Sequence, residues 1–84
     1  MKTIDKNTAA AIIRSEPAPY IVSRYNAEGN LEIGIPLNEN DGISDITKKI
    51  KLDAFVVKHL MGKDIQMFFG EEKGEVYRYI FQIQ

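Results

Sequence analysis

The most regular alternation of hydrophobic and polar positions in this chain lies between residues 31 and 37. Its apolar positions are Leu31, Ile33, Ile35 and Leu37. Charged, small or cyclic residues occupy the positions between them. This period of two predicts a strand with one buried face and one solvated face. Pro36 cannot donate a backbone hydrogen bond, so we expect this end of the strand at a sheet edge or at the end of a ladder.

Two glycine-containing turns each separate a pair of strand-like segments. The first hairpin joins residues 20–25 to residues 31–37 through Gly29, and the second joins residues 65–69 to residues 76–83 through Gly70 and Gly74. A late glycine in the five-residue first turn is typical of a type I turn followed by a left-handed glycine. Duplication of a helix–hairpin unit and independent use of glycine turns both explain the repetition.

A helix is predicted before each hairpin. The first covers residues 5–16, where Asp5 or Asn7 can cap the N-terminus and Pro17 ends the helix. Residues 44–61 admit two interpretations. They form one long helix capped by Ser44, or a strand over residues 46–52 followed by a short helix that Asp53 caps. We favour the long helix.

The long helix has a definite predicted orientation. Its buried stripe would be Ile43, Ile46, Ile50, Ala54, Val57, Leu60 and Met61, with Gly62 at its C-terminal end. Its solvent side would carry Lys48, Lys51, Lys58 and His59. Leu52 and Phe55 fit this stripe poorly.

These elements predict a single α+β domain over residues 1–84, with a small, mainly antiparallel sheet made of two β-hairpins. The sheet has four strands, or five if residues 46–52 form one. The main helix covers one face, and the short N-terminal helix packs at the side. The predicted core is Ile12, Ile21, Leu31, Ile33, Ile35, Ile46, Ile50, Val57, Leu60, Met67, Tyr79 and Phe81.

Size and composition limit the ways in which this fold is stabilised. The chain has 84 residues, no cysteine and one histidine, which excludes disulfides and the usual zinc sites. A chain this short has a thin stability margin, so self-association or docking on a partner is a further source of stability. The N-terminus lacks the apolar segment of a signal peptide, and no apolar run approaches the ~20 residues of a membrane helix. We therefore expect a cytoplasmic protein that makes no use of a membrane.

Charges are segregated along the chain, although the net charge is −1. Residues 26–45 carry five acidic and no basic side chains, and residues 46–63 carry five lysines against Asp53. Blocks of opposite sign pair within a domain or steer a partner towards it.

No residue pattern points to catalysis, a metal or a cofactor. A catalytic His59 would need a carboxylate or nucleophile beside it, and only a pocket that gathered two or more of Asp45, Asp53, His59 and Asp64 would supply one. The acidic loop at residues 38–42 does not fit an EF-hand, because Gly42 at the sixth loop position would put Lys48 at the twelfth. We expect a non-enzymatic protein without a cofactor.

The last hairpin motivates the leading functional hypothesis. On residues 76–83, one face carries aromatic and aliphatic residues, and the other carries Val76, Arg78 and Ile80, joined by Phe68 of the neighbouring strand. Apolar residues on both faces indicate a strand that is central or covered by something outside the domain. We predict that Phe68, Val76, Arg78 and Ile80 bind another protein or a second copy of the chain. The protein would be an accessory or inhibitory module that occupies its partner's surface.

Nucleic-acid binding is the alternative hypothesis. Its phosphate contacts would come from Lys48, Lys49, Lys51, Lys58 and Lys63. Its base-stacking residues would be Tyr20, Tyr25, Tyr77 and Tyr79. A pI of about 5.8 and the absence of an RNA-recognition signature argue against this alternative.

Overall fold

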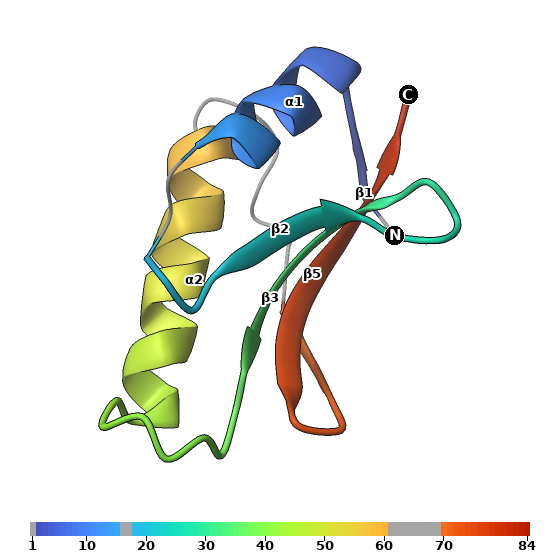
Figure 1. The fold of residues 1–84 in the computed structure, drawn as a ribbon. Helices are drawn as coiled ribbons and strands as arrows, with labels where there is room; N and C mark the ends of the chain where they lie inside the picture. Colours follow the sequence, from blue (N-terminus) through green and yellow to red (C-terminus); the bar gives the residue numbers. More distant parts are fainter. Residues whose placement is uncertain (1, 16–17, 61–69) are drawn as a thin grey trace.

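The computed structural model describes residues 2–15, 18–60 and 70–84, which form a two-layer fold of a five-stranded mixed sheet and two helices (Figure 1). The strands are β1 (Lys2–Ile4), β2 (Val22–Tyr25), β3 (Leu31–Pro36), β4 (Glu71–Lys73) and β5 (Val76–Ile83). The helices are α1 (Lys6–Arg14) and α2 (Asp45–Leu60), and both lie on the same side of the sheet. The predicted α+β class is confirmed.

The long strand β5 organises the sheet, whose order is β1-β5-β3-β2. β3 runs antiparallel to β5, from Leu31 opposite Phe81 to Pro36 opposite Val76. β2 pairs antiparallel with β3, and β4 pairs antiparallel with the beginning of β5. β1 runs parallel to the end of β5, with Thr3 opposite Gln82. This fifth strand comes from the N-terminus and not from residues 46–52, which lie within α2.

The first hairpin forms as predicted, whereas the second differs. Gly29 has a positive φ of 78°, and its N–H donates to the Asn26 carbonyl at 3.0 Å. Gly74 has a φ of 63° and turns the chain between β4 and β5. β4 occupies residues that were predicted to be part of a turn. The predicted strand at residues 65–69, with Met67, lies outside the described residues.

Both helices begin at the caps that the sequence predicts. The Asp5 carboxylate accepts a hydrogen bond from the Thr8 N–H at 3.2 Å. The Ser44 hydroxyl accepts one from the Thr47 N–H at 3.2 Å. Each cap satisfies a backbone donor that has no partner within its helix. The strand interpretation of residues 46–52 is wrong, because α2 is continuous from Asp45 to Leu60.

The hydrophobic core fills the space between the helices and the sheet. Its principal members are Ala9, Ile12, Leu31, Ile33, Ile35, Leu52, Val56, Leu60, Tyr79 and Phe81. Three residues that were predicted to belong to it do not: Ile46, Ile50 and Val57 are 72%, 62% and 45% exposed. α2 therefore turns a different side towards the sheet, which buries Lys48, Leu52, Val56 and Leu60.

Candidate functional site

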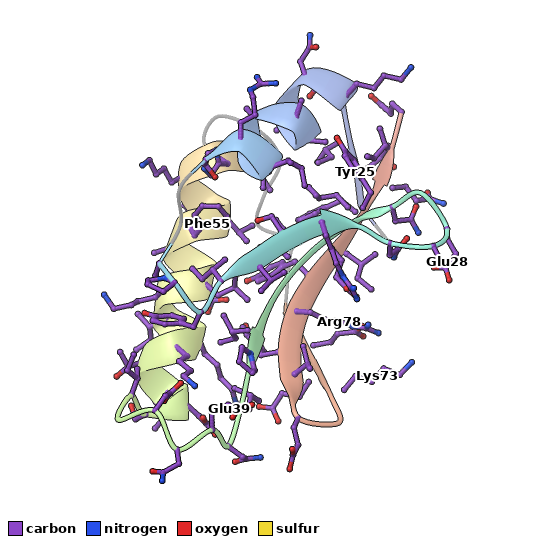
Figure 2. All side chains as sticks on the ribbon, in the orientation of Figure 1. Tyr25, Glu28, Glu39, Phe55, Lys73 and Arg78 are labelled. Carbon is purple, nitrogen blue, oxygen red and sulfur yellow. The ribbon has the colours of Figure 1, made fainter. Side chains whose placement is uncertain are left out.

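The face of the sheet that points away from both helices, here called the open sheet face, carries most of the predicted partner-binding residues. Its members are Val22, Arg24, Glu32, Gly34, Pro36, Val76, Arg78 and Ile80. Val76, Arg78 and Ile80 share this face because they alternate along β5 with the core-facing Tyr77, Tyr79 and Phe81. Arg78 extends from the side of β5 opposite to α2 (Figure 2). Phe68, the fourth predicted residue, lies outside the described residues.

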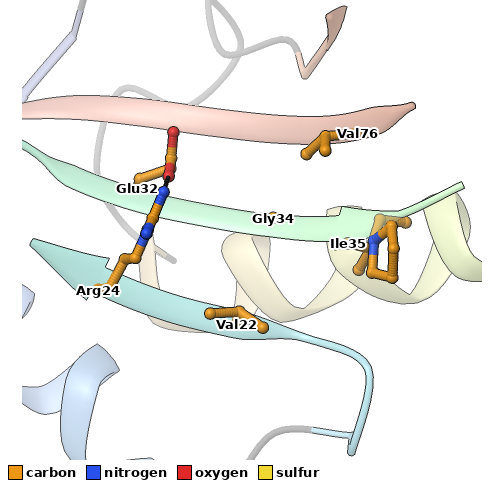
Figure 3. Close-up of a pocket in the computed structure, with 7 residues that line it drawn as sticks. Val22, Arg24, Glu32, Gly34, Ile35 and Val76 are labelled. Carbon is orange, nitrogen blue, oxygen red and sulfur yellow. Dashed lines mark hydrogen bonds and ion pairs between the residues drawn. The ribbon is translucent and has the colours of Figure 1, made fainter. Parts of the chain in front are cut away.

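A shallow groove of about 280 Å³ crosses the open sheet face. It is lined by Val22, Arg24, Glu32, Gly34, Ile35, Pro36 and Val76 (Figure 3). The groove exists because Gly34 has no side chain: a Cβ there would lie 3.4 Å from both Val76 Cγ1 and Arg78 Cβ. Val22 and Val76, which are 55% and 39% exposed, form the two apolar walls. The groove can accept an apolar side chain of a partner.

A row of alternating charges crosses four strands of the same face. The Arg24 guanidinium donates to the Glu32 carboxylate at 2.8 Å, and Arg78 donates to the other Glu32 oxygen at 2.9 Å. Arg78 also donates to Glu71 at 3.0 Å. The hydrogen bond from Arg24, supported by Arg78, holds the pKa of Glu32 below its ordinary value. These pairs fix the arginine side chains at one side of the groove and neutralise the charge of the row.

The inner side of α2 carries a buried lysine that the sequence had placed in solvent. The Lys48 side chain is completely buried, and its Nζ lies 2.6 Å from an Asp41 carboxylate oxygen and 3.3 Å from the Pro36 carbonyl oxygen. The hydrogen bond from Lys48 lowers the pKa of Asp41. At the first residue of α2, the Asp45 carboxylate accepts a hydrogen bond from the Asn38 N–H at 3.0 Å. These contacts tie the start of α2 to the loop that follows β3.

Asp53 makes a second polar connection, between α2 and β5. Its Oδ1 atom accepts hydrogen bonds from the hydroxyls of Tyr77, at 2.8 Å, and Tyr79, at 2.5 Å. Burial, followed by the bond to Asp53, raises the pKa of both tyrosines. If α2 were rotated about its axis until Ile46 and Ile50 faced the sheet, the hydrogen bonds of Asp53 to the two tyrosines would break. The contacts of Lys48 with Asp41 and the Pro36 carbonyl would break as well. This is the physical reason why the predicted orientation of α2 is wrong.

The outer side of α2 carries an exposed aliphatic row, here called the outer α2 row: Ile46, Ile50 and Val57. These residues are spaced by four and seven positions and therefore lie on one side of the helix. Lys51 and Lys58, which are also exposed, follow the row along one flank. Large aliphatic side chains that are exposed along one side of a helix make that side a candidate interaction surface.

The predicted nucleic-acid surface is not assembled as the sequence suggested. Lys48 is buried, and Lys49 forms an ion pair with Glu72 and lies 5.6 Å from the centre of the Tyr77 ring. Lys51 and Lys58 are exposed, and Lys63 lies outside the described residues. The hydroxyls of Tyr77 and Tyr79 are bonded to Asp53 at the helix-covered face, whereas Tyr25 is 49% exposed.

The residues considered for catalysis are engaged in separate contacts. Asp45 bonds to the Asn38 backbone, and Asp53 bonds to two tyrosines. His59 is half-buried and lies edge-on to the Phe55 ring, with 4.8 Å between ring centres. Its predicted place on the solvent side is therefore wrong, and burial, with a smaller contribution from Lys58, lowers its pKa. Asp64 lies outside the described residues.

Two further observations concern metals and membranes. Within residues 2–15, 18–60 and 70–84, no three His, Cys, Asp or Glu side chains come together as metal ligands would. Neither described helix is both long and apolar enough to span a membrane.

Sequence reasoning missed two parts of these surfaces. Gly34 was recognised as facing away from the core, but its absent side chain was not recognised as the floor of a groove. The outer α2 row was identified as an aliphatic stripe and then assigned to the core. The signal that could have corrected this assignment was the second aliphatic row, Leu52, Val56 and Leu60.

Comparison with known proteins adds no functional information, because no protein family, curated protein or solved structure matches this chain.

Proposed function

We propose that this chain is a non-enzymatic protein-binding module that uses the open sheet face to occupy the surface of a partner. The observation that carries the proposal is the groove over Gly34 between Val22 and Val76. The module would act in the cytoplasm as an accessory or inhibitory protein.

The character of the open sheet face supports this proposal over a purely solvated surface. Val22 and Val76 leave apolar area in water, and Arg78 stands beside them with only 21% of its side chain exposed. An arginine held by two carboxylates loses little conformational entropy when a partner docks on it. Arginine is one of the residue types enriched at the positions that contribute most of the binding energy of interfaces. A partner that places an aliphatic or aromatic side chain over Gly34 fits this surface.

The nucleic-acid alternative receives less support from the same contacts. Phosphate binding depends on cationic side chains that are free to neutralise phosphates and thereby displace the counterions of the nucleic acid. The burial of Lys48 and the pairing of Lys49 with Glu72 remove two of the five proposed contacts. The two arginines of the open sheet face are neutralised by Glu32 and Glu71.

A capture experiment with matched variants tests the proposed function. The immobilised full chain is exposed to a lysate of the organism that encodes it, and light scattering reports self-association in parallel. Val76→Asp places a charge in the groove, and Gly34→Val fills it without adding charge. We expect both changes to reduce capture of the partner, or self-association, by about tenfold or more. Ile50→Asp, on the outer side of α2, should leave binding at the sheet unchanged.

Other results would contradict the proposal. One is a protein that remains monomeric and captures nothing. Another is capture that Val76→Asp and Gly34→Val leave intact. Loss of capture in Ile50→Asp alone would move the binding site from the sheet to α2.

A further inference from the structure

The outer α2 row is a second apolar surface, separate from the open sheet face. Ile46 and Ile50 are more exposed than any other large hydrophobic residue that the structure describes. Burying such side chains would release about 25 cal/mol for each Å² of apolar surface removed from water. The sheet cannot provide this cover, because α2 already packs on it through Leu52, Val56 and Leu60. No described element covers the row, which we therefore consider as a surface for a partner.

The charged side chains beside this row indicate which charge a partner should carry. Lys51 and Lys58 are exposed, and within the described ranges neither forms an ion pair. The acids of α2 are directed elsewhere, because the Asp45 carboxylate accepts a hydrogen bond from the Asn38 N–H and the Asp53 carboxylate accepts them from the Tyr77 and Tyr79 hydroxyls. Among the described residues, the outer side of α2 thus presents aliphatic residues beside two lysines that form no ion pair. A complementary partner has an apolar stripe bordered by carboxylates.

The shape of the row favours a helix as the occupant. Ile46 to Val57 extends over about 16 Å of helix, at about 1.5 Å per residue. A straight row of this length matches the apolar stripe of three turns of another helix, whose side chains pack between those of the first. A two-fold antiparallel pairing of α2 with a second copy is opposed by charge, because it brings like flanks together and places Lys51 near Lys58 of the copy.

From these observations we infer that the outer side of α2 binds an acidic amphipathic helix of another protein. Ile46, Ile50 and Val57 contact its apolar stripe, and Lys51 and Lys58 pair with its Asp or Glu residues. This site goes beyond the proposed function, because it uses a different surface and does not require the groove over Gly34. A chain with both sites could hold two partners at once, one on each layer of the fold.

Two synthetic helical peptides test the inference directly. Both have about 18 residues and the same leucine stripe, but one carries Glu and the other Lys along its flank. Fluorescence anisotropy measures their binding to the full chain at about 0.05 M and about 0.5 M salt. We expect the Glu peptide to bind at least about tenfold more tightly than the Lys peptide at low salt, and to lose much of this preference at high salt.

Variants separate the apolar contribution from the charged one. Ile50→Asp should weaken binding of the Glu peptide by about tenfold or more. The double variant Lys51→Glu with Lys58→Glu should reverse the preference, so that the Lys peptide binds more tightly. Because all three positions are exposed, the variants should fold as the wild type does, which circular dichroism confirms. Val76→Asp, on the open sheet face, is the matched control and should bind the Glu peptide normally.

Several outcomes would overturn the inference. They are equal binding of the two peptides, absence of binding at about 1 mM peptide, and a preference that the double charge reversal does not change. Vesicles of phosphatidylcholine and phosphatidylglycerol are a further probe. Stronger retention on these vesicles than on the Glu peptide, with loss in Ile50→Asp, would identify an anionic membrane surface as the occupant instead.

Discussion

α2 carries two rows of aliphatic residues, and comparing them shows what determines burial in this fold. The inner row, Leu52, Val56 and Leu60, is at most 2% exposed, whereas Ile46, Ile50 and Val57 of the outer row are 45–72% exposed. The residues of the two rows are similar in hydrophobicity, so transfer free energy alone does not choose between them. The inner side differs because Lys48 on it, and Asp53 at the border between the two rows, find hydrogen-bond partners in the β3 loop and in β5.

The lysines of the helix repeat the same contrast. Lys48 is buried and paired with Asp41, whereas Lys51, one turn later on the outer side, is exposed and has no ion pair within the part of the chain that the structure describes. A buried charge requires a partner, because its desolvation is otherwise too costly. An exposed charge has no such requirement and remains available for binding. Among the described residues, polar pairing therefore marks the structural side of α2, and the exposed Lys51, which forms no ion pair there, lies on the side that we assign to a partner.

Truncating one residue of each row should give the largest difference in stability. Leu52→Ala leaves a cavity in the core and should lower the free energy of unfolding by about 3 kcal/mol. Ile50→Ala removes an exposed side chain and should change it by less than about 0.5 kcal/mol. Urea unfolding followed by circular dichroism measures both values. Equal losses in the two variants would mean that the outer row is covered in the isolated protein and would contradict the comparison.

Replacing Lys48 and Lys51 one at a time should also give two different losses in the free energy of unfolding, with a smaller difference between them. Lys48→Ala removes the packing of a buried stem and the tie to Asp41, and should cost about 1–2 kcal/mol in urea unfolding. Lys51→Ala should cost less than about 0.5 kcal/mol. Lys48→Met keeps most of the apolar stem and should recover most of the loss. A methionine variant as unstable as the alanine variant would show that the charge, and not the packing, is the main contribution of Lys48.

The smallest expected effect concerns stability in acid. Lys48 lowers the pKa of Asp41 in the folded state below its ordinary value of 3.8. The stability that the pair of Lys48 and Asp41 adds to the folded state is therefore fully present above pH 3.8, the ordinary pKa of Asp41. It is lost as the pH falls through the lower pKa that Asp41 has in the folded state. Between about pH 5 and pH 2, wild type should lose more stability than Lys48→Met. Glu32, whose pKa is also lowered, is present in both proteins and does not affect the difference.

Lys51→Met is the control for the acid titration. It removes a lysine from the same helix but leaves the pair between Lys48 and Asp41 in place. Its stability should follow the wild-type pH dependence. If Lys48→Met and Lys51→Met have the same acid slope, the contact between Lys48 and Asp41 does not persist in solution.

Local patterns in the sequence were sufficient for most of the individual elements. The alternation at residues 31–37 predicts β3, and Leu31, Ile33 and Ile35 are buried as this pattern requires. Gly29 and Gly74 mark the two hairpin turns, because a positive φ is least costly for glycine. Asp5 and Ser44 mark the two helix starts through their side-chain oxygens. Each of these features depends on residues that are close together in the chain.

The same local reasoning reached part of the candidate site. Val76, Arg78 and Ile80 were placed on one face, because a strand alternates its side chains with a period of two. The charge row and the groove were not predictable in this way. They depend on the register that sets Arg24 opposite Glu32, and both Gly34 and Glu71 opposite Arg78, which brings together residues from four strands.

The sequence by itself determined the α+β class, the hairpin turns, the helix caps and the pattern of the central strand. Only the tertiary structure decided the parallel pairing of β1 with β5, the burial of Lys48 and the side of α2 that faces water. The physical reason is that the first group depends on neighbouring residues along the chain, whereas the second depends on distant partners. α2 offers two aliphatic rows to the sheet, and the choice between them is made by Asp41, Tyr77 and Tyr79, which lie outside the helix.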